Sequence, residues 1–76
     1  DIVALDSDGN NIIFGECKYW RSPIGLDILE KLRLKSSAVE WNRDKRTEHY
    51  ILFSISGFTQ DLVEYAQEHK NVILYC

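Results

Sequence analysis

The 76-residue sequence predicts a small α/β domain built on a mixed β-sheet. Two observations predict this class. First, two apolar, β-branched-rich runs flank a turn that contains an Asp-Gly pair, which is typical of an antiparallel hairpin. Second, short apolar runs farther along the chain alternate with segments of helical periodicity, and that alternation requires crossover connections between parallel strands. The expected order is strand, strand, helix, strand, helix, strand.

The composition is that of one ordinary globular domain spanning residues 1–76. Hydrophobic residues make up 45% and charged residues 28% of the chain, which excludes the disordered and collagen-like classes. No apolar run approaches the roughly 20 residues that cross a bilayer, so no membrane partner is expected. The two cysteines do not form a disulfide framework, which favours a reducing cytoplasm.

Residues 1–5 and 11–18 are the two strands of the predicted hairpin. If Asp8 and Gly9 are the central residues of a two-residue turn, every cross-strand pair has residue numbers that sum to seventeen. A three-residue loop would instead shift the register by one and move each side chain of the first strand to the other face.

Helical spacing of apolar residues predicts a first helix over about 23–42, with Ser22 as its cap and Pro23 as its first residue. The polar segment 42–47 is expected to be a loop. The apolar stripe of this first helix is formed by Ile28, Leu29, Leu32 and Val39.

Two short apolar runs, 50–53 and 72–75, are predicted to be buried strands. Between them, Thr59 is expected to cap a second helix that ends near His69 and Lys70.

Charge is unevenly distributed along the chain. Segment 18–46 holds eight basic and four acidic residues, a net charge of +4, whereas the whole chain has a net charge of −3. This segment is interpreted either as a solvated helix face followed by a charged loop or as a surface that contacts a phosphate backbone.

The predicted register places a charged cluster at one end of an apolar strand face. Asp1 faces Glu16, and Lys18 lies one strand step beyond on the same face. Two facing carboxylates repel each other, and a divalent cation such as Mg²⁺ would resolve the conflict while keeping sites for a phosphate oxygen and an attacking water. Lys18 could then stabilise charge that develops on the phosphate. The pattern predicts a phosphodiesterase site.

A plainer interpretation is that Glu16 and Lys18 are an ordinary charged pair at a strand end and that Asp1 is simply a terminal residue. Cys17 alternates away from this cluster and is expected to be a small core residue.

The chain resembles the PD-(D/E)xK nuclease superfamily, in which an acid on the second core strand and a (D/E)xK tripeptide on the third form a metal site. The similarity is closest to the nuclease-like C-terminal domain of archaeal P-loop ATPases, and extends more distantly to archaeal Holliday-junction resolvases and type IV restriction enzymes. The residues that carry it are Asp1-Ile2-Val3-Ala4-Leu5, Gly15-Glu16-Cys17-Lys18-Tyr19-Trp20 and Ser54-Ile55-Ser56-Gly57-Phe58-Thr59.

The resemblance implies a restriction-endonuclease-like mixed sheet whose N-terminal hairpin carries the site. It implies a deoxyribonuclease that depends on Mg²⁺ or Mn²⁺, with Asp1 and Glu16 as metal ligands and Lys18 as the catalytic lysine. The backbone carbonyl of Cys17 would complete the coordination. It further implies that the chain is a fragment of a longer ATPase, lacking the first helix and strand of the family, with DNA as its partner.

Two alternatives remain open. The domain could be a catalytically inactive nuclease-fold module of an archaeal ATPase. Such a module would bind DNA or regulate the ATPase. It could also form a homodimer, for which Trp20 and Trp41 are candidate anchors.

Overall fold

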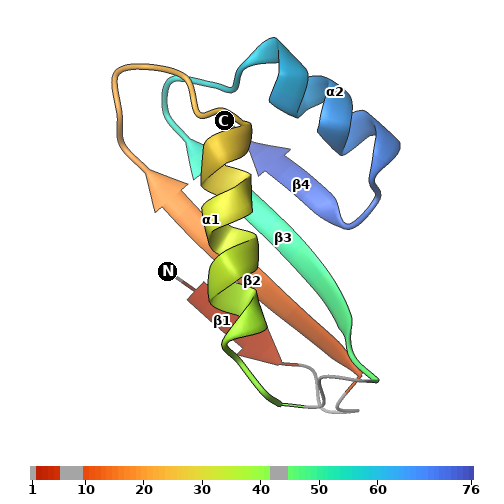
Figure 1. The fold of residues 1–76 in the computed structure, drawn as a ribbon. Coiled ribbons are helices and arrows are strands. Elements are labelled where there is room, and N and C mark those ends of the chain that lie inside the picture. The colour runs from red at the N-terminus through yellow and green to blue at the C-terminus, as the bar shows by residue number, and fades with distance from the viewer. Residues whose placement is uncertain (1, 6–9, 42–44) are drawn as a thin grey trace.

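A computed structural model describes residues 2–5, 10–41 and 45–76 of the chain. They form a four-stranded mixed sheet with two helices, in the predicted order strand, strand, helix, strand, helix, strand (Figure 1). The elements are β1 (Ile2–Leu5), β2 (Asn11–Lys18), α1 (Leu26–Ser37), β3 (Thr47–Ser54), α2 (Gln60–Glu68) and β4 (Val72–Tyr75).

The N-terminal hairpin has the predicted register. β1 pairs with β2 in antiparallel fashion, from Ile2 opposite Gly15 to Leu5 opposite Ile12, so the residue numbers of each described pair sum to seventeen. The turn itself, residues 6–9, lies outside the described residues. The confirmed register places Val3 and Leu5 on the same sheet face as Phe14.

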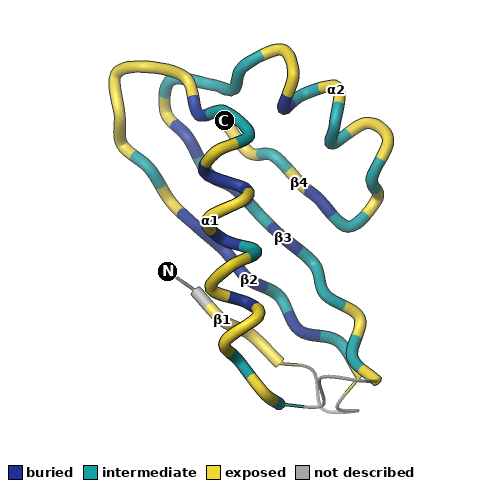
Figure 2. Tube along the Cα trace, viewed as in Figure 1, coloured by how far each residue is buried: buried dark blue, intermediate teal, exposed yellow. Residues whose placement is uncertain are grey.

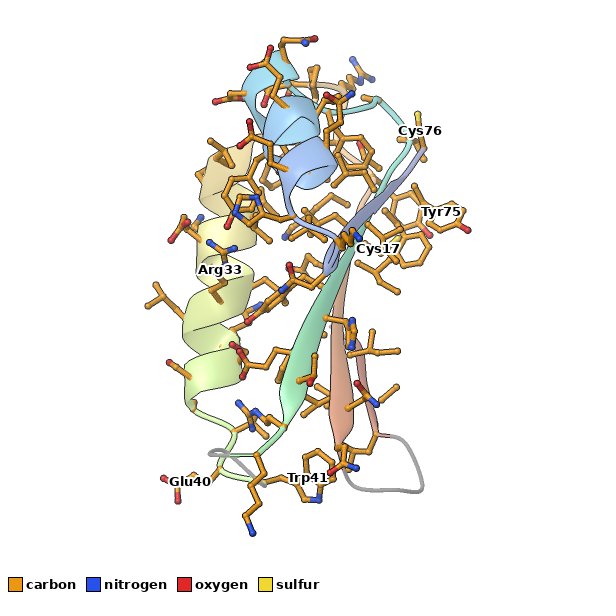
Figure 3. The ribbon with its side chains drawn as sticks, turned by 90° about the vertical axis from the view of Figure 1, so that its right-hand side faces the viewer. Cys17, Arg33, Glu40, Trp41, Tyr75 and Cys76 are labelled. Atoms are coloured by element: carbon orange, nitrogen blue, oxygen red, sulfur yellow. The ribbon has the colours of Figure 1, made fainter. Side chains whose placement is uncertain are left out.

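The other two pairings are parallel, as expected. β2 pairs with β3 and β3 pairs with β4, which gives the spatial order β1-β2-β3-β4. Each parallel pair is joined by a helix, and successive right-handed crossovers in the same direction place both helices on one side of the sheet. Figure 3 shows α1 and α2 on that side.

The hydrophobic core lies between α1, α2 and the helix-covered face of the sheet. Buried positions gather where α1 crosses the central strands (Figure 2). Phe14 on β2 stacks on Tyr50 of β3 with ring centroids 5.9 Å apart. The buried apolar residues are Ile12, Phe14, Ile24, Ile28, Leu29, Leu32, Tyr50, Leu52, Leu62 and Val72.

The predicted span 23–42 is too long for α1, which begins at Leu26 with Gly25 as its N-cap. Ser22 and Pro23 lie before the helix because the backbone of Ile24 is bonded to the segment after β3. The Ile24 amide donates to the Gly57 carbonyl at 3.0 Å, and the Ile24 carbonyl accepts from the Thr59 amide at 2.8 Å. These bonds hold Ile24 in a bridge to Phe58, so the helix starts after it.

The remaining boundaries follow the predictions with smaller differences. Thr59 is the N-cap of α2, although its hydroxyl donates to Asp61 and accepts no hydrogen bond from a backbone amide. β3 begins at Thr47, earlier than predicted, because the polar start of the strand pairs with β2. In the part of the chain that the structure describes, neither helix is long and apolar enough to cross a membrane.

Candidate functional site

The predicted site residues Glu16 and Lys18 lie near the carboxyl end of β2, between β1 and β3. Strand alternation puts both side chains on the face that α1 covers. Glu16 is 8% exposed. It lies beside Leu52 of β3, which is fully buried. The strand thus places a carboxylate at the margin of the hydrophobic core, where an uncompensated charge would be costly.

Two ammonium groups converge on this carboxylate. The Nζ atom of Lys18 lies 3.4 Å from Glu16 Oε1, and the Nζ atom of Lys35 lies 3.6 Å from the same oxygen. Lys18 comes from the same strand, whereas Lys35 comes from the last turn of α1. The structure therefore confirms that Glu16 and Lys18 meet and adds a third residue to the cluster.

The charges around Glu16 keep it ionised. Burial by itself raises the pKa of this carboxyl, but the hydrogen bond from Lys18 and the positive charges of Lys35 and Lys18 outweigh burial and lower the pKa below its ordinary value. At neutral pH the group is a carboxylate. Glu16 therefore presents a hard, negatively charged oxygen of the kind that divalent cations prefer.

Lys35 was not predicted as a site residue. It follows the buried Ile28 and Leu32 at helical spacing, so its side chain starts from the core-facing side of α1 and its ammonium reaches past the core edge. That spacing is a signal available in the sequence. Its meeting with Glu16, however, depends on where the helix crosses β2, which no local pattern specifies.

Aromatic contacts and a buried serine surround Lys18. Its ammonium lies 5.1 Å from the centroid of the Trp20 ring, in a cation–π contact. Across the sheet it is in register with the buried Ser54 of β3. The Trp20 carbonyl accepts a hydrogen bond from the Ser56 hydroxyl, which ties the segment after β2 to the segment after β3.

The segments after β2 and β3 are fixed to each other at the carboxyl end of the sheet. Ile24 and Phe58 form a parallel bridge, and the Ile24 amide bonds to the carbonyl of Gly57. Gly57 has φ of +85°, a conformation that side-chain-bearing residues rarely adopt. The Glu16 cluster lies next to this end of the sheet.

The other two predicted site residues have different outcomes. Asp1 lies outside the described residues, so its pairing with Glu16 stays a prediction. The side chain of Cys17 alternates away from Glu16, as predicted, but the expectation that it is a core residue is wrong. Cys17 is exposed, because both helices cover the opposite face of the sheet (Figure 3). Only its backbone carbonyl remains a candidate ligand.

The described residues contain no group of three or more His, Cys, Asp or Glu side chains placed to hold a metal ion. Glu16 suits a divalent ion by its ionised oxygen, but two ammonium groups on the same oxygen oppose a second positive charge. A metal would therefore need another carboxylate. The sequence places Asp1 in that role.

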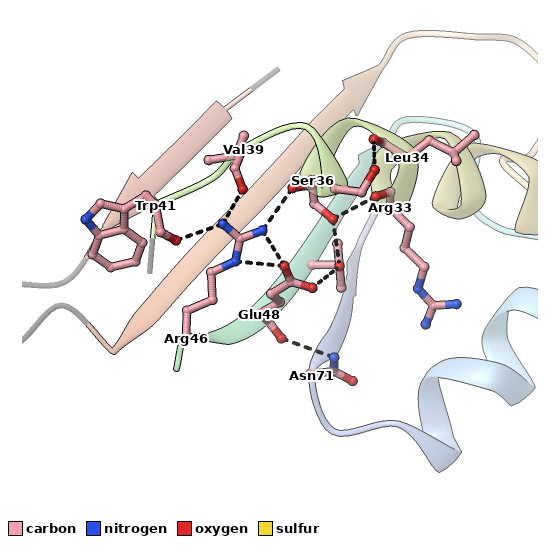
Figure 4. A network of polar contacts seen from close by, with 10 residues as sticks. Arg33, Leu34, Ser36, Val39, Trp41, Arg46, Glu48 and Asn71 are labelled. Carbon is pink, nitrogen blue, oxygen red and sulfur yellow. Dashed lines mark hydrogen bonds and ion pairs between the residues drawn. The ribbon is translucent and has the colours of Figure 1, made fainter. Parts of the chain in front are cut away.

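Arg46 belongs to a separate, structural network. Its side chain is only 1% exposed and donates to Glu48 Oε2 from Nε at 2.9 Å and from Nη2 at 2.6 Å (Figure 4). It also donates to the carbonyls of Ser36, Val39 and Trp41, at 2.9, 2.6 and 2.9 Å. The guanidinium thus satisfies carbonyls at and beyond the C-terminal end of α1.

This network and the Glu16 cluster involve much of the basic segment 18–46. Arg33 donates to the Tyr65 hydroxyl and pairs with Glu30 at 3.4 Å. Together with Lys18, Lys35 and Arg46, it has intramolecular partners. At least these four of the eight basic residues of the segment therefore have partners within the domain.

Comparison with known proteins adds no relative. No protein-family model matches the chain, and no match was found among curated proteins or among solved structures.

Proposed function

We propose that this chain is a restriction-endonuclease-like domain that hydrolyses phosphodiester bonds of DNA with Mg²⁺ or Mn²⁺. The observation that supports this most is the buried Glu16 carboxylate, which is held ionised beside the Lys18 ammonium on one strand face. Such a pair supplies an oxygen ligand for a hard cation and a positive charge for a phosphate oxygen. The mixed sheet with an N-terminal hairpin fits this fold.

Glu16, Asp1 and the backbone carbonyl of Cys17 would hold the ion. When bound, such an ion polarises the phosphate and makes a coordinated water more acidic. Lys18 has a different role. Its ammonium lies between the Glu16 carboxylate and the Trp20 ring, which restricts where it can point, and it stabilises negative charge on the phosphate. We place this activity in the cytoplasm, since Cys17 and Cys76 are both free thiols.

Plasmid nicking in the presence of Mg²⁺ or Mn²⁺ tests this proposal. The Glu16→Gln variant keeps the side-chain shape but removes the charge, so nicking should fall to the level of a protein-free control. Lys18→Met should slow nicking while leaving metal binding in place. Glu40→Gln is the matched control, because this exposed carboxylate lies at the far end of the molecule from Cys17 (Figure 3). Equal nicking by the wild type and a folded Glu16→Gln variant would contradict the proposal.

A second candidate function is a catalytically inactive nuclease-fold module of an archaeal ATPase that binds DNA or regulates the enzyme. One observation favours it. Lys18 and Lys35 already neutralise Glu16 within the domain, as an ion pair kept only for stability would do. Absence of nicking by a folded wild-type protein, together with absence of Mn²⁺ binding, would favour this candidate over the enzyme.

A further inference from the structure

One face of the sheet has no helix over it in the described part of the chain. Both crossovers place their helices on the side of Glu16 and Phe14, so the other side is left to the strands alone (Figures 1 and 3). Figure 3 shows Cys17 and Tyr75 on this side, away from α1 and Arg33. The open face is defined here by the side chains of Ile13, Cys17, Ile51, Phe53, Ile73 and Tyr75.

The open face is apolar, although a solvent-facing sheet usually is not. A sheet with one solvated face alternates apolar and polar residues along each strand, whereas parallel strands buried on both sides are apolar throughout. β4 reads Val72-Ile73-Leu74-Tyr75 and is apolar throughout. Its outward residues are substantially exposed, with Ile73 at 43% and Tyr75 at 60%. The sequence of β4 is therefore that of a strand covered on both sides.

Charge distinguishes this face from the rest of the molecule. The chain is 28% charged, yet the described strand residues that point to the open side include no Asp, Glu, Lys or Arg. Their most polar members are Asn11, Thr47 and His49, at the far end of β2 and β3, and the His49 ring is hydrogen-bonded to Asn11 at 3.1 Å. Depletion of charge together with aromatic residues is the signature of an interface core.

We propose that the open face is the interface of a homodimer, in which a second copy of this chain covers it. A two-fold interface places a patch against itself, which a charged patch resists through repulsion and an uncharged apolar patch does not. A polyanion such as DNA finds no cation among the described strand side chains of this face. The self-complementary partner is thus the one that the chemistry of the face favours.

The dimensions of the face suit such a dimer. Four strands about 4.8 Å apart, two of eight residues and two of four at about 3.3 Å each, give a sheet area of roughly 380 Å². Side-chain relief and flanking residues add to this area, and the lower end of specific interfaces is roughly 600 Å² per partner. Ile55 and Tyr19 lie beside it at the carboxyl end of the sheet, 64% and 74% exposed, and extend the apolar area.

The carboxyl end of the open face contains a hollow in which a side chain of the partner copy can bind. Phe53 and Tyr75 stack with ring centroids 5.7 Å apart. These rings and Cys17 line part of a hollow of about 270 Å³, whose rim also includes Lys18 from the other side of β2. Rigid aromatic pairs beside a hollow are typical of interface positions that contribute most to binding. Ile73, one strand step before Tyr75, is an exposed aliphatic side chain that a partner copy can insert there.

Sedimentation velocity over a range of protein concentrations tests the proposal. The wild type should shift with concentration from 8.9 kDa to about twice that mass. Ile73→Glu, which places a charge on the open face, should stay monomeric. Leu34→Glu is the matched control, since Leu34 is an aliphatic residue on α1 that is 71% exposed, and it should dimerise like the wild type. A wild type that is monomeric at all concentrations, or a dimeric Ile73→Glu, would overturn the proposal.

Alkylation of Cys17 gives a second measurement that does not depend on a disruptive variant. In a Cys76→Ser protein, Cys17 is the remaining thiol, and it lies on the open face. Its alkylation rate should fall with rising protein concentration in proportion to the fraction of free monomer. A rate that does not change while the mass doubles would place the dimer contact elsewhere and refute this face as the interface.

Discussion

The Glu16 side chain is where burial and charge compete most directly in this domain. Desolvation alone would favour the neutral acid, yet Lys18 and Lys35 both lie within 3.6 Å of one carboxylate oxygen. Their combined effect lowers the pKa, so the ionised state prevails. A carboxylate that is kept charged at the edge of a core is a recognised feature of functional sites, and also of structural ion pairs.

Acid should weaken the fold through Glu16. Its pKa lies below the ordinary value of 4.5 in the folded state. Between the folded and unfolded pKa values the unfolded chain binds more protons, so the free energy of unfolding rises with pH there. The contribution is fully present above about pH 4.5 and is lost as the pH falls through the lower, folded value.

Urea unfolding measured from pH 7 downward checks this sign. The wild type should lose more stability in acid than the Glu16→Gln variant, and the difference between the two should develop below about pH 4.5. The remaining carboxylates titrate in both proteins and cancel in the comparison. An equal acid loss in the two proteins would show that Glu16 is not held charged by its neighbours.

The pair on β2 could be predicted from the sequence, because Glu16 and Lys18 are two residues apart and strand alternation places such residues on one face. The contact of Lys35 with Glu16 could not. It joins residues nineteen positions apart and depends on the path of α1 across the sheet. The position of Cys17 outside the core also depends on which face the helices cover.

At the scale of elements, the C-terminal end of α1 is stabilised by Arg46, the residue that precedes β3. Arg46 fills the space beside Glu48, and its guanidinium satisfies carbonyls of the α1 terminus and the chain that follows (Figure 4). The Tyr50 hydroxyl donates to the other Glu48 oxygen at 2.9 Å. The network therefore connects α1 to β3.

Removing Arg46 should destabilise the domain strongly. Arg46→Met removes a buried ion-pair partner of Glu48 and the donors that Arg46 gives to the helix-end carbonyls, so the free energy of unfolding should fall by roughly 3–5 kcal/mol. A domain of this size has a free energy of unfolding of roughly 4–11 kcal/mol, so this loss removes a large part of its stability. Urea or thermal unfolding followed by circular dichroism measures the change. Lys45→Met, at the exposed neighbouring position, should change it by less than about 0.5 kcal/mol.

A loss of less than about 1 kcal/mol for Arg46→Met would contradict the structural role of the network. The sequence did not predict this structural role of Arg46. Arg46 lies in a run of charged residues whose composition is typical of an exposed loop, and its burial results from the return of the chain under α1.

Helix boundaries illustrate the same limit. The spacing of Ile28, Leu29 and Leu32 correctly predicted α1. Its start was placed too early because Pro23 is a favourable first helical residue. The bridge between Ile24 and Phe58 overrides that preference, since both backbone groups of Ile24 are already bonded. Contacts between distant segments thus decided where a locally encoded helix begins.

At the scale of the whole molecule, strand register was the most predictable feature. A two-residue Asp-Gly turn predicted the pairing of β1 with β2 that the described residues follow, whereas a three-residue loop would have shifted it by one. Continuous apolar runs predicted the two later parallel strands, 50–53 within β3 and 72–75 in β4. Those same runs contained the information that the sheet is apolar on both faces, of which the two helices cover one.

The arrangement gives the molecule two distinct surfaces. The proposed metal-dependent site lies on the helix-covered side at the carboxyl end of β2, and the proposed dimer interface lies on the opposite side of the same strands. Adjacent residues of β2 belong to the two surfaces, because Glu16 and Lys18 point to one side and Cys17 to the other.

The central claim, that Glu16 belongs to a metal site, is tested most directly by calorimetric titration of Mn²⁺ at neutral pH into the wild type, Glu16→Gln and the distant control Glu40→Gln. Mn²⁺ prefers oxygen ligands and reports on the same kind of site as Mg²⁺. We predict saturable binding to the wild type and to Glu40→Gln, and loss of that binding in a folded Glu16→Gln protein. Binding that is equal in all three proteins, or absent from a folded wild type, would contradict the claim.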